Sequence, residues 1–95
     1  MPRYLIVRSF EVGEDQMPHV GRRSRALTED GMREITWEHS HVVVTDEGLV
    51  RTYCVYEARD EETVRRHGEK LGRHTIDALE EIAGDVTPAD FPPAS

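Results

Sequence analysis

Two histidines lie two residues apart in the segment W-E-H-S-H-V-V-V, residues 37–44, directly ahead of three valines. The valines and the tryptophan favour a β-strand, and alternate side chains of a strand share one face. We therefore expect Trp37, His39, His41 and Val43 on the same face. Two imidazoles at this spacing can reach one metal ion, at about 2.0–2.1 Å from each nitrogen. The segment predicts half of a metal site, or two hydrogen-bonded histidines of a dimer interface.

Other ligand-type side chains follow further along the chain. Cys54, His67 and His74 are the stronger candidates, and Glu57 and Asp77 are weaker oxygen ligands. Taken singly, these residues have simpler interpretations: a lone histidine on the apolar face of a helix is usually a hydrogen-bonded core residue, and a lone cysteine is usually a buried thiol. The candidate site therefore depends on which of these residues the fold brings to His39 and His41.

The elements that would position these side chains follow from the pattern of apolar residues. Strands are predicted at 3–10, 34–44, 49–58 and 75–83, the last with a helical turn as the alternative. One helix starts near Pro18 and ends before Gly31, and a second is capped by Asp60 and ends at Gly72. The order β-α-β-β-α-β predicts an α+β, ferredoxin-like fold, with two helices on one face of an antiparallel sheet.

The residues partition into one domain, 1–84, and a proline-rich extended arm, 85–95. The uncovered face of the sheet favours a dimer of two such sheets. Trp37, on the same face as the histidines, would then anchor the dimer interface.

The loop between the second and third strands decides what the histidines face. If the loop is Asp46–Glu47–Gly48, His39 is opposite Val55, His41 is opposite Tyr53 and Ser40 is opposite Cys54. In that register Glu57 lies opposite Trp37. A four-residue loop would instead place His39 opposite Cys54. We favour the first register because Gly48 suits a bulged three-residue turn.

The composition excludes several classes of function. The chain of 95 residues has a net charge of −7, so we expect no nucleic-acid partner. No stretch is long and apolar enough to predict a membrane span or a signal peptide. The single cysteine allows no internal disulfide, which favours the cytoplasm.

Four segments together resemble a known family: WEHSHVVV, TYCVYEA, VRRHGEKLGRH and EIAGDVTPADFP. In this succession, from Met17 onwards, the chain is similar to a family of small bacterial ferredoxin-like proteins, formerly a domain of unknown function, that includes a nickel-binding, nickel-responsive member. The resemblance implies a homodimer that binds a transition metal, with nickel as the first candidate. The motif positions that carry ligand-type side chains are His39, His41, Cys54, His67 and His74.

We therefore expect a cytoplasmic metal-binding protein, a buffer or sensor without catalytic activity of its own. Nitrogen-rich ligands suit nickel, zinc, copper or cobalt, and the resemblance selects nickel. Two alternatives remain. One is a small-molecule binder or acid–base enzyme that uses a pocket between sheet and helices around His67, lined also by Cys54 and Tyr56. The other is an interaction module that meets its partner at a strand edge or at the arm.

Overall fold

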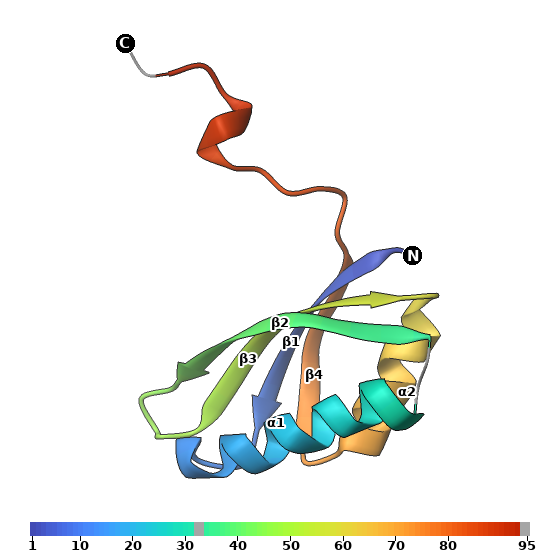
Figure 1. Cartoon of the computed structure of the whole chain (residues 1–95). Helices are drawn as coiled ribbons and strands as arrows, with labels where there is room; N and C mark the ends of the chain where they lie inside the picture. Colours follow the sequence, from blue (N-terminus) through green and yellow to red (C-terminus); the bar gives the residue numbers. More distant parts are fainter. Residues whose placement is uncertain (32–33, 94–95) are drawn as a thin grey trace.

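Four strands and two helices make up the main elements of the fold, in a computed structural model that describes residues 1–31 and 34–93. They are β1 (Arg3–Phe10), α1 (Met17–Ala26), β2 (Ile35–Val44), β3 (Val50–Ala58), α2 (Glu61–Leu71) and β4 (His74–Glu81). The strands form one antiparallel sheet in the order β2-β3-β1-β4. Both helices lie on the same face of this sheet (Figure 1). The predicted ferredoxin-like α+β fold is confirmed.

The helix ends follow the signals in the sequence. Asp60 caps α2, because its side chain accepts a hydrogen bond of 2.8 Å from the backbone N–H of Thr63. Gly72 ends α2 with a positive φ of 69°, which glycine adopts without strain. After Ala26, α1 continues as a wider π-helical turn, Leu27–Gly31. The first helical segment therefore includes Gly31, where the sequence predicted its end just before this residue.

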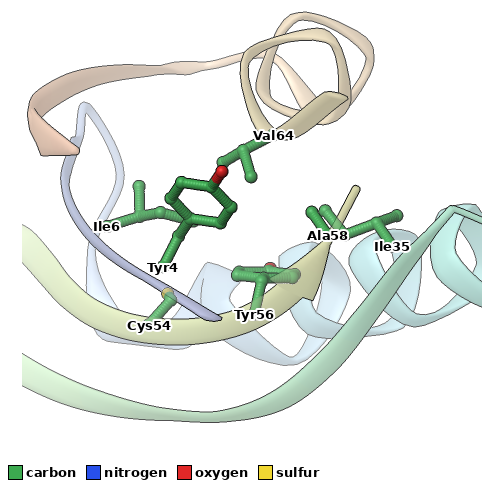
Figure 2. Close-up of a cluster of buried hydrophobic side chains, with 7 residues drawn as sticks. All are labelled: Tyr4, Ile6, Ile35, Cys54, Tyr56, Ala58 and Val64. Atoms are coloured by element: carbon green, nitrogen blue, oxygen red, sulfur yellow. The ribbon is translucent and has the colours of Figure 1, made fainter. Parts of the chain in front are cut away.

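The core fills the space between the sheet and the helices. Its larger cluster comprises Tyr4, Ile6, Ile35, Cys54, Tyr56, Ala58 and Val64 (Figure 2). A second cluster comprises Phe10, Val12, Val20, Val50 and Leu71. Alternate residues of β1 point into this layer, as the period of a strand requires, and one of them, Arg8, is charged and fully buried.

The register of the β2–β3 hairpin agrees with the favoured alternative, except at Trp37. His39 pairs with Val55, Ser40 with Cys54 and His41 with Tyr53. The register shifts at Glu38, so that Trp37 pairs with Tyr56 and not with Glu57. This bulge turns Trp37 to the helix side of the sheet, because one extra residue reverses the alternation of side chains. The prediction that Trp37 shares a face with His39 and His41 is therefore wrong.

After β4 the chain leaves the sheet as an arm that points away from it (Figure 1). The arm holds a short 3-10 turn, Pro88–Asp90, and Ala94 and Ser95 lie outside the described residues. The segment just before the arm is tied to the sheet, since Ile82 N–H donates to the carbonyl of Arg3 at 2.8 Å. Within the described ranges, no helix is long and apolar enough to span a membrane.

Candidate functional site

His39 and His41 lie on the open face of the sheet, opposite the helices. Both are on β2, which is an edge strand, and both are exposed. Their ring centroids are 5.5 Å apart, with one ring edge-on to the other. The two side chains therefore share one face of the strand, as the spacing of two predicted.

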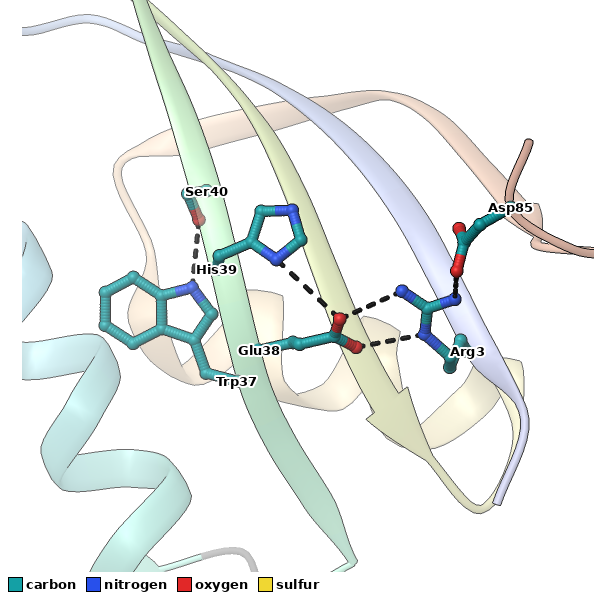
Figure 3. Close-up of polar contacts among 6 residues, drawn as sticks. All are labelled: Arg3, Trp37, Glu38, His39, Ser40 and Asp85. Carbon is teal, nitrogen blue, oxygen red and sulfur yellow. Dashed lines mark hydrogen bonds and ion pairs between the residues drawn. The ribbon is translucent and has the colours of Figure 1, made fainter. Parts of the chain in front are cut away.

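A charged network flanks His39 on the open face. Glu38 accepts two hydrogen bonds from the guanidinium of Arg3, at 3.0 and 2.9 Å, and Asp85 of the arm accepts a third at 2.6 Å (Figure 3). The Arg3 guanidinium holds the pKa of Glu38 below its usual value. One Glu38 oxygen lies 3.8 Å from His39 Nδ1, so a fixed carboxylate stands beside this imidazole.

Trp37 faces away from this network, as Figure 3 shows. Its indole N–H donates to Ser40 Oγ at 2.9 Å. Its ring stacks on that of Tyr56, with centroids 6.4 Å apart. Trp37 is thus half-buried against the core, and the predicted role as an anchor on the open face does not apply.

His67 is fully buried in a polar cluster on the helix side. Arg8 Nη2 donates to His67 Nδ1 at 3.3 Å, and because a guanidinium only donates, this nitrogen carries no proton. His67 Nε2 then donates to Ser24 Oγ at 3.4 Å. Burial, and next the charge of Arg8, lower the pKa of His67 to about 4. The imidazole is therefore neutral at physiological pH.

Cys54 belongs to the same cluster and not to the open face. Its thiol donates to Thr52 Oγ1 at 3.3 Å and accepts from Arg8 Nη1 at 3.9 Å. The thiol is free and buried. The body of the sheet thus separates Cys54 and His67 from His39 and His41.

Arg8 is the centre of this cluster, and the sequence analysis did not identify it. The signal was present, because Arg8 alternates with Ile6 and Phe10 on the inward face of the first strand. Its Nη1 also donates to Tyr56 OH at 3.2 Å. In the part of the chain that the structure describes, no carboxylate pairs with its charge, and Nε has no partner.

A cavity of about 460 Å³ lies beside this cluster, between α1 and the β2–β3 side of the sheet. Arg8, Cys54 and Tyr56 line it, together with Trp37 and residues of α1, whereas His67 does not. The expected pocket between sheet and helices is present, but Arg8 takes the place predicted for His67.

His74 lies on β4, at the edge of the sheet opposite β2. It is half-buried, its Nδ1–H donates to the carbonyl of Gly72 at 2.8 Å, and its ring packs on Phe10 with centroids 5.0 Å apart. The five predicted ligands therefore fall in three places. Among residues 1–31 and 34–93, no three His, Cys, Asp or Glu side chains gather closely enough to hold a metal ion.

Comparisons with known proteins agree with the sequence pattern. A family model described as "Nickel responsive protein SCO4226-like" matches residues 4–82. The chain is also similar to the crystal structure of SCO4226 from Streptomyces coelicolor A3(2), with a TM-score of 0.69 and 21% identity, over 88% of this chain and 99% of that chain. At this identity the likeness supports the fold alone. A search of curated proteins gave no match.

Proposed function

Because the chain belongs to the SCO4226-like family of nickel-responsive proteins, we propose that it binds nickel through the imidazoles of His39 and His41. The observation that carries this proposal is their common position on the open face of β2, with ring centroids 5.5 Å apart. Imidazole nitrogen is a suitable ligand for nickel. Cys54 and His67 are buried on the opposite face and His74 is at the opposite edge, so we leave them out of the ligand set.

Two imidazoles are an incomplete site, and a second protomer is the simplest source of further ligands. The open face has an apolar centre that includes Leu5, which is 36% exposed, and Val55. Two such faces packed by a two-fold axis would bury this centre. An axis that runs across the strands would also place a second β2, with its pair of imidazoles, over the first. We propose that nickel binding and dimerisation use this same face.

The role we propose is that of a cytoplasmic nickel buffer or sensor without catalytic activity of its own. The buried His67 supports this, because a neutral imidazole that solvent does not reach is poorly placed for acid–base catalysis. The lone cysteine, which is a free buried thiol, is consistent with a reducing compartment.

Calorimetric titration of the metal-free protein with Ni²⁺ tests the proposal. The variant is the double substitution His39→Ala/His41→Ala, and the control is His19→Ala, which removes an exposed histidine of α1. Loss of an outer-shell partner alone weakens metal binding by about 10–100-fold, so loss of both ligands should cost more than about 100-fold. The control should bind as the wild type does.

If the double variant binds Ni²⁺ as tightly as the wild type, the ligands are elsewhere and this assignment is wrong. Titration with Zn²⁺ and Co²⁺ on the same three proteins then distinguishes a nickel site from a general site for divalent ions.

A further inference from the structure

Arg8 carries a positive charge in a place where charges are rarely found unpaired. Its side chain is 1% exposed, and a guanidinium remains charged in proteins. Its partners on Nη1 and Nη2 are neutral: the Tyr56 hydroxyl, the Cys54 thiol and the unprotonated Nδ1 of His67. Its Nε has no hydrogen-bond partner in the described residues. A buried charge without a counter-charge is unfavourable unless an anion pairs with it.

The cavity beside Arg8 has room for such an anion. Its volume of about 460 Å³ lies within the range of small-molecule pockets. The stacked rings of Trp37 and Tyr56 and the side chains of Met17 and Val20 give it a largely apolar wall. Hydroxyl groups enter the wall at a few points, from Ser24, Ser40 and Thr52.

The mouth of the cavity lies between the start of α1 and the edge strand β2, where the lining residue Val42 is also exposed. The exposed lining residues there include Glu14 and Pro18, close to the start of α1. Glu14 is the only acidic residue among those that line the cavity, and it makes no ion pair with Arg8 in the described structure. The positive charge of Arg8 at the inner end favours a ligand whose anionic group lies there, away from Glu14.

We propose that this cavity binds a small organic carboxylate, with the carboxylate at the guanidinium of Arg8 and an apolar body against Trp37 and Tyr56. The planar guanidinium matches a carboxylate. An apolar wall disfavours a strongly hydrated inorganic anion, which would lose its water without finding equivalent partners. The site is on the opposite face of the sheet from His39 and His41, so it shares no residue with the proposed nickel ligands.

Trp37 makes binding directly measurable, because it is the only tryptophan of the chain and lines the cavity. Phenylacetate and hexanoate serve as probes. Phenylacetamide, the uncharged amide analogue of phenylacetate, serves as the control. We expect saturable changes in tryptophan emission with both carboxylates. The amide should bind at least about 10-fold more weakly, since a hydrogen bond to a charged group is stronger than one to a neutral group.

Substitutions at Gly21 locate the site without altering the buried cluster. Gly21 lines the cavity from α1, and a Cβ added there would meet no atom within 4 Å. Gly21→Leu should fold, because glycine is the poorer helix former, and should block the probe. Gly21→Ala is the matched control and should keep most of the binding. Arg8→Met should abolish the preference for the carboxylate, and circular dichroism will report whether it folds.

Several outcomes would overturn the proposal. They are the absence of a saturable response to both carboxylates, equal affinity for phenylacetate and phenylacetamide, and unchanged binding in Gly21→Leu. Competition of inorganic phosphate at the affinity of phenylacetate would make this an inorganic anion site and would overturn the apolar part of the assignment. The Gly21 variants keep the test decisive if Arg8→Met does not fold.

Discussion

Trp37 and His39 are two residues apart on the same strand, yet their side chains lie on opposite faces of the sheet. Trp37 pairs with Tyr56 and stacks on its ring, whereas His39 pairs with Val55 on the open face. The bulge at Glu38 separates them. One strand therefore supplies both the aromatic wall of the cavity and the proposed metal ligands.

The first prediction separates these two roles. Trp37→Ala should destabilise the protein by about 2–3 kcal/mol, less than the 3–5 typical of a fully buried ring, because Trp37 is only half-buried. His39→Ala removes an exposed side chain from the same strand, and should change the stability by less than about 0.5 kcal/mol. Urea unfolding measures both. Nickel affinity should fall strongly in His39→Ala and little in Trp37→Ala. A large loss of nickel affinity in Trp37→Ala would contradict the separation of the two faces.

The second prediction concerns the carboxylate beside His39. Glu38→Gln should weaken nickel binding by about 10-fold, because it removes a negative charge 3.8 Å from His39 Nδ1 that favours a nearby cation. Asp85→Asn is the control, since Asp85 also binds Arg3 and makes no contact with His39 in the described structure. Calorimetry at low and high salt should show the difference shrink with salt, as expected of exposed charges. Equal losses in both variants would show that Arg3, and not the Glu38 charge, matters.

The third prediction is a loss of stability in acid that arises from His67. Its pKa is about 4 in the folded protein and 6.5 is the ordinary value. Between these values the unfolded chain binds a proton that the folded chain does not, so stability falls as the pH falls through this range. The loss from pH 7.5 to pH 5 should be about 2 kcal/mol. Burial also lowers the pKa of His74, which adds a loss of the same sign.

Urea unfolding of the wild type and His67→Gln at pH 7.5 and pH 5 measures this effect. The variant should lose stability at both values but show a smaller difference between them, because its side chain does not titrate. His19→Gln removes an exposed histidine and should keep the full difference. If His67→Gln lost as much stability between pH 7.5 and pH 5 as the wild type does, other groups would cause the acid sensitivity.

The fourth prediction concerns the open face as a dimer interface. Leu5→Glu places a charge at the centre of this face and should weaken dimerisation by at least about 10-fold, because burying an unpaired charge is costly. Leu49→Glu is matched in exposure, at 41% against 36%, but lies in the β2–β3 loop. Sedimentation equilibrium, with and without Ni²⁺, compares the two. A monomeric wild type at all concentrations, or equal effects of both substitutions, would rule out this interface.

The sequence by itself determined the fold and the family. Three of its signals are local: the strand alternation in residues 3–10, the Asp60 cap and the glycine that ends α2. They can be recognised in the sequence because they depend on short-range sterics and hydrogen bonds. The shared face of His39 and His41 is equally local, since it needs only the period of a strand.

Only the tertiary structure decided where Trp37 points and which residue faces the cavity. The bulge at Glu38 leaves no mark in the local pattern, because it depends on how β2 pairs with β3. Arg8 looked like an ordinary charged residue of a strand. Only the folded structure shows that Arg8 is buried under the helices, surrounded by neutral groups and next to a cavity. Contacts between distant segments set burial, and burial is what makes an unpaired charge informative.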